Sequence, residues 1–289
     1  MKRFALTFAS AVLFCTSMFA QTYTFQEVNY PGDTFTQLLG VNNANVIAGY
    51  HGADVNKGFT LVLPSSFTTE NYPKSVQTQV TGINNNGETV GFYIDTNNVT
   101  HGFKNVNGIY GTVDFPGEPF NQLLGVSSNG QLVGYFSTKA DNSGPEYPTF
   151  YDQIGTPAVS GALIINGGVT AQGTGINNAG IVSGFVQDSK GVFHGFVLTG
   201  GHCELLNFPG STGTMALGLN NSGRVVGSYT DSTNATHGFI YNTFSKSFTS
   251  IDDPNGVGTT IVNGINDNNV IVGFWGNSPN NTGFVGTPQ

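Results

Sequence analysis

Charge is scarce in this sequence, and most of it is of one sign. Charged residues make up 9% of the 289 residues, against about 25% in typical globular domains. Lys and Arg number 9 and Asp and Glu number 17, so the formal net charge is −8. Nucleic acids and anionic membranes both attract basic surfaces. We therefore expect no nucleic-acid partner and no binding to an anionic membrane.

Cysteine and good helix formers are also scarce. The two cysteines are Cys15 and Cys203. Because Cys15 lies in a segment that we expect to be cleaved, Cys203 stands alone and no intramolecular disulfide can form. Gly is abundant at 41 residues, and Asn crowds the turns. This composition predicts β structure with many tight turns.

Catalytic signatures are missing as well. We find no nucleophile elbow, phosphate loop, zinc helix or cysteine nucleophile motif. The Gly-rich "GGVTAQGTG" from Gly167 precedes no predicted helix, so it is not read as a nucleotide loop. Glycosidases need two carboxylates about 5 to 10 Å apart, and the glutamates recur at no position that would pair them by sequence, although a pair across repeats stays open. They are Glu27, Glu70, Glu88, Glu118, Glu146 and Glu204. We expect no catalytic residues and no cofactor.

The first twenty residues have the pattern of a secretory signal peptide. Lys2 and Arg3 precede an apolar run over Phe4–Phe14, which is too short to span a bilayer because a span needs about 20 residues. Small residues follow, and Ala20 is the expected cleavage site. Cleavage brings the net charge from −8 to −10. The rest, 21–289, has no apolar run of spanning length, so we expect a secreted, extracellular or periplasmic protein.

One phrase is present in six copies. "GINNNGETVGFY" from Gly82 recurs as "GVNNANVIAGY", "GVSSNGQLVGY", "GINNAGIVSGF", "GLNNSGRVVGS" and "GINDNNVIVGF". The phrase glycines are Gly40, Gly82, Gly125, Gly175, Gly218 and Gly264, spaced by 42, 43, 50, 43 and 46 residues. An aromatic anchor follows in "HGF" or a variant: Phe59, Phe103, Phe150, Phe196, Phe239 and Phe284. Turns such as "NYPG", "DFPG" and a weaker "IING" at Ile164 come before the phrases. Periods of 20 to 50 residues indicate a repeat architecture.

Each unit divides into four short extended runs. In the second unit we expect strands over Gln79–Asn84, Glu88–Ile94, Gly102–Val106 and Ile109–Phe115. The Asn and Gly between the first two tolerate the positive φ of tight hairpins. Four antiparallel strands in about 43 residues match one propeller blade. The sequence therefore predicts one all-β domain over 21–289, a six-bladed β-propeller, in which glycine allows the innermost strands to converge.

The two ends of the chain complement one another. The last unit stops after its third strand, at "GFVGTPQ", whereas Thr22–Tyr30 resembles a fourth strand. We expect this segment to complete the last blade and to close the ring. An open solenoid would need polar capping repeats, and none is visible.

The pattern G-[IVL]-N-N-x-G-x-x-x-G followed by H-G-F resembles the bacterial extracellular repeats of the HAF family, over nearly all of 21–289. The resemblance implies a secreted or surface location, and the family lends no activity to individual residues. The third unit departs most, with "YPTF" at Tyr147 and a longer loop over Ser137–Pro148.

Asp and His recur together on the face that carries the "HGF" connections. The pairs are Asp95 with His101, Asp188 with His194, and Asp231 with His237. His and Asp together can serve as base or metal ligand. We favour hydrogen bonds that fix the turns, since histidines one blade apart cannot converge on one zinc. Asp267 in "NDNN" is one carboxylate, too few for calcium, and Trp275 is interpreted as a packing residue.

Four glutamines are the candidate ligand-binding residues: Gln37, Gln79, Gln122 and Gln172. Each lies three residues before a phrase glycine, and Gln offers both donors and acceptors to neutral polar ligands such as glycans. The alternative, that they hydrogen-bond the loop backbone between blades, stays open. The leading functional prediction is a secreted, monomeric binding module for a glycan or a surface protein. A polysaccharide hydrolase or lyase and a structural matrix protein remain alternatives.

Overall fold

The computed structural model describes residues 22–152, 157–159, 170–277 and 279–289, and these form β-strands and no helix. The expected signal peptide, the "IING" turn at Ile164 and the "GGV" that begins at Gly167 lie outside the described residues. We number the units one to six after their phrase glycines.

Units one to three contain the following strands. Unit one has β2 (Thr36–Val41), β3 (Val46–His51), β4 (Lys57–Val62) and β5 (Ser66–Thr69). Unit two has β6 (Gln77–Ile83), β7 (Thr89–Ile94), β8 (Thr100–Val106) and β9 (Ile109–Thr112). Unit three has β10 (Phe120–Val126), β11 (Leu132–Ser137), β12 (Glu146–Tyr151) and β13 (Pro157–Val159).

Units four to six follow the same order. Unit four has β14 (Thr170–Ile176), β15 (Val182–Gln187), β16 (Phe193–Thr199) and β17 (His202–Leu206). Unit five has β18 (Gly213–Leu219), β19 (Arg224–Thr230), β20 (Thr236–Asn242) and β21 (Ser247–Ile251). Unit six has β22 (Ile261–Ile265), β23 (Ile271–Asn277) and β24 (Asn280–Pro288), and β1 (Tyr23–Val28) lies beside β24.

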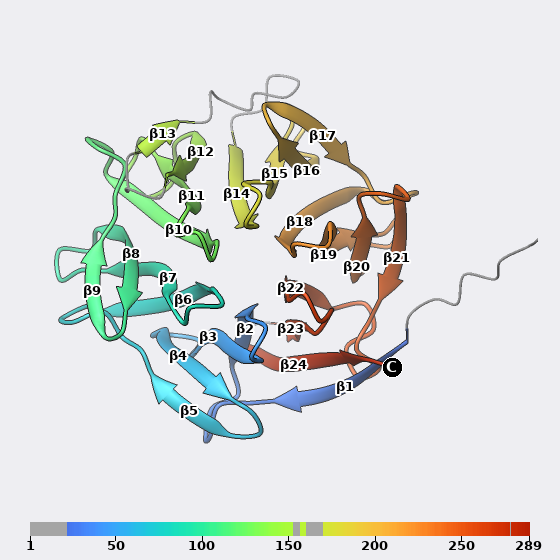
Figure 1. Cartoon of the computed structure of the whole chain (residues 1–289), viewed down its shortest axis with the longest axis horizontal. Helices are drawn as coiled ribbons and strands as arrows, with labels where there is room; N and C mark the ends of the chain where they lie inside the picture. The colour runs from blue at the N-terminus through green and yellow to red at the C-terminus, as the bar shows by residue number, and fades with distance from the viewer. Residues whose placement is uncertain (1–21, 153–156, 160–169, 278) are drawn as a thin grey trace, which may run out of the picture.

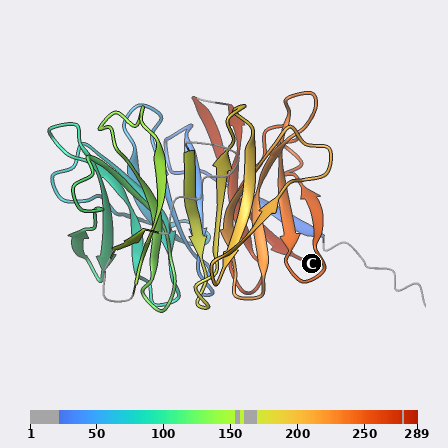
Figure 2. The same ribbon diagram turned by 90° about the horizontal axis from the view of Figure 1, so that it is seen from above.

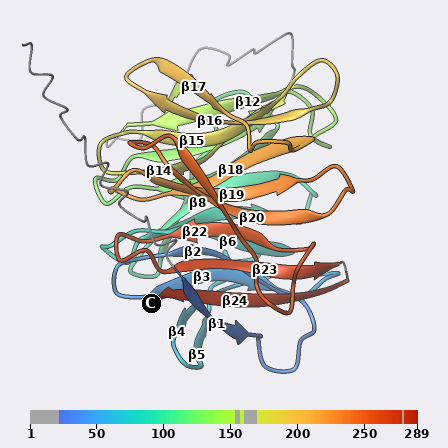
Figure 3. The same ribbon diagram turned by 90° about the vertical axis from the view of Figure 1, so that its right-hand side faces the viewer.

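Consecutive strands of each unit pair antiparallel, and the units surround a common axis. The first strand of each unit is innermost in Figure 1. The side views show the sheets as adjacent layers with their strands running along the axis (Figure 2 and Figure 3). The hairpins between the first two strands take the expected positive φ, for example 78° at Gly87 and 59° at Asn45. The local turn chemistry was therefore predicted correctly.

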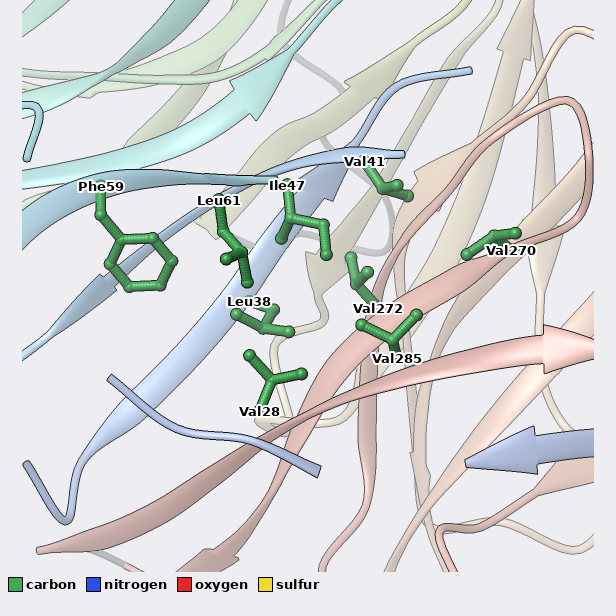
Figure 4. Packing of buried hydrophobic residues seen from close by; sticks show 9 residues of the cluster. All are labelled: Val28, Leu38, Val41, Ile47, Phe59, Leu61, Val270, Val272 and Val285. Carbon is green, nitrogen blue, oxygen red and sulfur yellow. The ribbon is translucent and has the colours of Figure 1, made fainter. Parts of the chain in front are cut away.

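The N-terminal strand belongs to the last unit. β1 pairs antiparallel with β24 from Tyr23 opposite Pro288 to Val28 opposite Gly283. This pairing confirms that Thr22–Tyr30 supplies the strand missing from unit six. Behind it, a buried cluster joins the two ends of the chain. Its members are Val28, Leu38, Val41, Ile47, Phe59, Leu61, Val270, Val272 and Val285 (Figure 4).

The phrase glycines touch one another around the axis. A Cβ built on Gly40 would lie 3.1 Å from the Cα of Gly82, and a Cβ on Gly264 would lie 3.2 Å from the Cα of Gly40. The four intervening contacts, made by Gly82, Gly125, Gly175 and Gly218, are 3.4, 3.1, 3.2 and 3.2 Å. Most of these spacings are tighter than ordinary Cβ contacts, so a side chain at any of these positions would push on the backbone of the next unit, which favours glycine there.

A second circle of contacts runs through the "NNxG" hairpins. In each hairpin the backbone N–H of the second residue donates to a side-chain oxygen of its equivalent in the next unit. The pairs are Asn43 to Asn85 (2.8 Å), Asn85 to Ser128 (3.3 Å), Ser128 to Asn178 (2.8 Å), Asn178 to Asn221 (2.9 Å), Asn221 to Asp267 (2.8 Å) and Asp267 to Asn43 (2.9 Å). The repeated asparagines therefore join neighbouring units as well as shaping their own turns.

The core lies between the sheets. The "HGF" phenylalanines Phe59, Phe103, Phe196, Phe239 and Phe284 are fully buried. Phe150 of the divergent third unit is only partly buried. In unit two the strands differ from prediction by up to three residues at their ends. β9 stops at Thr112, although the Val113 N–H still donates to the Gly102 carbonyl of β8 at 2.9 Å. Two residues further on, Phe115 stacks on Phe136 of the next unit, with ring centroids 4.5 Å apart.

Candidate functional site

The two ends of the axis differ in chemistry. We call the end with the "NNxG" hairpins the NNxG face. The opposite end carries the loops that precede the third strands and the connections between units, and we call it the HGF face. A cavity of about 210 Å³ lies on the axis between them, lined mainly by the innermost strands.

The residue before each phrase glycine lines this cavity, and leucine alternates with a polar residue: Leu39, Thr81, Leu124, Thr174, Leu217 and Asn263. The three polar side chains bond away from the cavity. Thr81 donates to the Leu123 carbonyl at 2.8 Å, Thr174 to that of Ala216 at 2.9 Å, and Asn263 to that of Leu38 at 2.9 Å. The polar side chains at this level therefore already bond to neighbouring units, and the cavity lining as a whole mixes polar and apolar surface.

The NNxG end of the axis is a smaller polar hollow of about 90 Å³. Asp267 is the only carboxylate among the residues that line it, and it accepts from the side-chain amides of Asn43 (2.8 Å) and Asn221 (2.9 Å). Burial disfavours its charged form, but the hydrogen bonds from these asparagines outweigh burial and lower its pKa. Asp267 therefore serves the hydrogen-bonded circle.

The four predicted glutamines occupy equivalent places on the innermost strands. Each lies two residues before the leucine or polar residue that precedes the phrase glycine. Gln37 accepts from the Tyr50 hydroxyl at 2.6 Å. Gln79 donates to Asn56 of unit one at 2.7 Å, and Gln172 donates to Glu146 of unit three at 2.9 Å. Of the four, only Gln172 lines the axial cavity. Gln79 therefore bonds a loop residue of the preceding unit and Gln172 bonds the first residue of β12, and both contacts are made to side chains rather than to loop backbone.

The predicted aspartate and histidine pairs are present, but each histidine also has a closer partner. The predicted pairs are 3.8 Å apart for Asp95 and His101, 3.4 Å for Asp188 and His194, and 3.5 Å for Asp231 and His237. The shorter contacts run to the turn before the next unit: His101 with Asp114 (2.6 Å), His194 with Asn207 (2.7 Å) and His237 with Asp252 (2.7 Å). These contacts join the third strand of a unit to the turn that follows its fourth strand.

The same aspartates also cap their own loops. Asp95 accepts from the backbone N–H groups of Asn97 and Val99, both at 2.8 Å. Asp188 and Asp231 repeat this arrangement. Backbone hydrogen bonds chiefly lower the pKa of Asp95 and Asp188, whereas the hydrogen bond from the Thr233 side chain has the largest lowering effect on the pKa of Asp231. Sequence spacing alone favoured the loop aspartate because it is nearer along the chain. The fourth strand brings the turn residue closer in space.

His51 was not among the predicted pairs, and its arrangement is different. It lies at the end of β3, outside an "HGF" motif, and its Nδ1 lies 2.9 Å from Asp33 in the turn before its own unit. Tyr30 stacks on its ring with centroids 3.5 Å apart. Tyr72 with Tyr93 and Phe208 with Tyr229 form the same stack, at 3.7 and 3.6 Å. The signal in the sequence is the aromatic residue that the turns before units one, two and five share: Tyr30, Tyr72 and Phe208.

Unit six replaces that stack by Asp253 and Trp275. Trp275 packs against a buried cluster, as predicted. A Cβ built on Gly256 would lie 2.3 Å from the Cβ of Trp275, so Gly256 also contacts this side chain closely. Asp253 is 1% exposed, and burial raises its pKa. Its Oδ2 and the Trp275 indole nitrogen are buried and have no hydrogen-bond partner among the described residues.

No group of three or more His, Cys, Asp or Glu residues is arranged to hold a metal ion in the described part of the chain. Cys203 is a half-buried free thiol, and burial raises its pKa. The described residues also contain no helix that is long and apolar enough to cross a membrane.

Comparison with known proteins shows the fold. No family model matches the chain, and no curated protein matches it. An Agrobacterium tumefaciens protein assigned as TolB superposes with a TM-score of 0.61 over 93% of this chain and 99% of its own, at 9% identity.

Two further solved structures are similar. The Aleuria aurantia lectin, a fungal six-bladed β-propeller, gives a TM-score of 0.52 over 86% of this chain and 92% of its own, at 10% identity. A Xanthomonas campestris gluconolactonase gives 0.54 over 89% and 88%, at 8% identity. At these identities the likeness concerns the fold alone, and the chain has the all-β architecture of the β-propellers.

Proposed function

We propose that the protein is a closed six-bladed propeller of the secreted HAF repeat type that binds a carbohydrate at the HGF end of its axis. The closed ring is supported by the pairing of β1 with β24 and by the contact of Gly264 with Gly40. Carbohydrate as the ligand class agrees with the lectin of the same fold, whose structure was described for its fucose recognition mode.

The observation that carries the binding proposal is the unused hydrogen-bonding capacity of the four glutamine side chains. Each keeps at least one amide end without a hydrogen bond to another described residue. That end is Nε2 in Gln37 and Oε1 in Gln79 and Gln172, and both ends are unbonded in Gln122. A sugar hydroxyl both donates and accepts, so it can use either end. Because three of these side chains are already held by a protein partner, less conformational freedom is lost on binding.

A glycan array probed with the chain without residues 1–20 tests the proposal. We expect binding to a restricted set of glycans, and competition by the free oligosaccharide. The same preparation should be incubated with polysaccharides and the products analysed. Release of short products would favour the hydrolase or lyase alternative. Absence of both binding and products would reject the carbohydrate proposal and favour the structural matrix protein.

A further inference from the structure

Unit three differs from the others at the HGF face. The loop between its second and third strands covers residues 138–145, whereas the corresponding loops of units one, two, four and five have five residues each. β12 begins directly after this loop with Glu146, which also forms a one-residue parallel bridge with Thr170 at the start of β14. The longer loop therefore brings a carboxylate to the boundary between units three and four.

Glu146 is fixed there by neutral amides. Its Oε1 accepts from the Asn142 side chain at 2.9 Å, and its Oε2 accepts from Gln172 at 2.9 Å. No Lys, Arg or His of the described residues forms an ion pair with it. Gln172 lines the axial cavity, so Glu146 lies one hydrogen bond away from its wall. A partly buried carboxylate without a cation beside it keeps unused capacity to accept hydrogen bonds.

Two of the surrounding polar atoms are acceptors without a partner. The Oδ1 of Asn142 is buried and has no hydrogen-bond partner among the described residues. The Oε1 of Gln172 accepts no hydrogen bond from a described residue, while the Nε2 of the same side chain is bonded. The nearby Tyr135 hydroxyl stays protonated and neutral, since burial and the charge of Glu146 raise its pKa. The cluster thus has three oxygen-bearing side chains that can accept hydrogen bonds, and no Lys, Arg or His of the described residues forms an ion pair with its carboxylate.

We propose that Glu146, Gln172 and Asn142 bind a protonated amino group of the carbohydrate, which makes the preferred ligand an amino sugar with a free amine. The proposal rests on the proposed function. An ammonium group has three N–H donors and a positive charge, so it can satisfy several oxygens at once. A hydroxyl has one donor and no charge. A metal ion fits poorly, because the cluster has one carboxylate and calcium requires six to eight oxygen ligands.

Calorimetric titration with two tetrasaccharides tests the proposal. One is the glucosamine tetramer with free amines, and the other is its fully N-acetylated form. We expect the wild-type protein to bind the free-amine tetramer at least tenfold more tightly. Glu146→Gln should reduce this preference to about twofold or less while the melting temperature stays close to that of the wild type. A rise in ionic strength should weaken binding of the free-amine tetramer more than that of its acetylated form.

Glu118→Gln is the matched control. Glu118 lies in the turn before β10, on the same face, and the substitution removes the same charge away from Gln172. It should leave the preference unchanged. Equal affinity of the wild type for both tetramers, or a tenfold preference that survives Glu146→Gln, would overturn the amine inference. If neutral glycans still bind in either case, the proposed function stands. If no glycan binds at all, both proposals fail.

Discussion

Gly264 and Gly40 touch across the junction between the last and first units. A Cβ placed on Gly264 would lie 3.2 Å from the Cα of Gly40 and 2.8 Å from the Leu39 carbonyl oxygen. Both neighbours are backbone atoms, which cannot rotate away as a side chain does. The first and last units therefore meet in a contact where any added Cβ would press on backbone atoms.

Gly264→Ala should for this reason destabilise the protein by about 1 to 3 kcal/mol, the usual cost of overpacking. Chemical denaturation with the change in midpoint as readout measures it. Gly111→Ala is the control, because no atom lies within 4 Å of a Cβ built there. It should change stability by less than about 0.5 kcal/mol. Equal stability of the two variants would contradict the axial contact.

Deletion of Thr22–Tyr30 should open the edge of β24 and remove Val28 from the cluster in Figure 4. We expect a loss of several kcal/mol, since each large apolar side chain contributes about 1.5 to 3 kcal/mol when fully buried. Thermal unfolding of the protein with and without this segment gives the comparison. A melting temperature within two or three degrees of the intact chain would show that the strand does not contribute to closure.

His237 should make stability depend on pH. Burial lowers its pKa, but the Asp252 and Asp231 carboxylates outweigh burial and raise it above 6.5. A group with a raised folded-state pKa contributes stability that is fully present below its unfolded pKa and is lost as pH rises through the folded value. We therefore expect unfolding free energy to fall above pH 6.5.

The variant His237→Gln should lose about 0.5 to 1.5 kcal/mol at pH 6, the net worth of a hydrogen bond, and should show a smaller decline towards pH 8. His202→Gln is the control, because His202 is exposed in β17. Denaturation curves between pH 5.5 and 8 provide the test. A wild-type profile that rises over this range would contradict the assignment.

The glutamine prediction can be tested with a double variant. Gln79→Ala with Gln122→Ala should weaken glycan binding at least fivefold, which corresponds to about 1 kcal/mol. The melting temperature should fall only slightly, because among these two side chains only Gln79 bonds a neighbour.

The control for that variant lies on the NNxG face. Asn85→Ala with Asn178→Ala removes two acceptors of the circle of hydrogen bonds, those used by Asn43 and Ser128. It should lower stability and leave glycan affinity intact. If the asparagine pair abolishes binding and the glutamine pair does not, the ligand binds at the NNxG face.

Much of the fold followed from local signals in the sequence. The period of the repeat predicted the units, the Asn and Gly of the hairpins predicted positive φ, and the matching ends predicted the pairing of β1 with β24. These features depend on residues close in sequence or on a repeated pattern, so they can be inferred without coordinates. The glycine contacts around the axis followed from the same reasoning, because innermost strands must converge.

The partners of the polar side chains were decided by the tertiary structure. His101 bonds Asp114 across two strands instead of Asp95 in its own loop, and Glu146 reaches Gln172 in the next unit. Such contacts depend on how the sheets twist and on where loops of neighbouring units project. Sequence spacing records neither quantity, so it determined the repeating scaffold of this protein, while the packing of one unit on the next decided which groups meet at the axis.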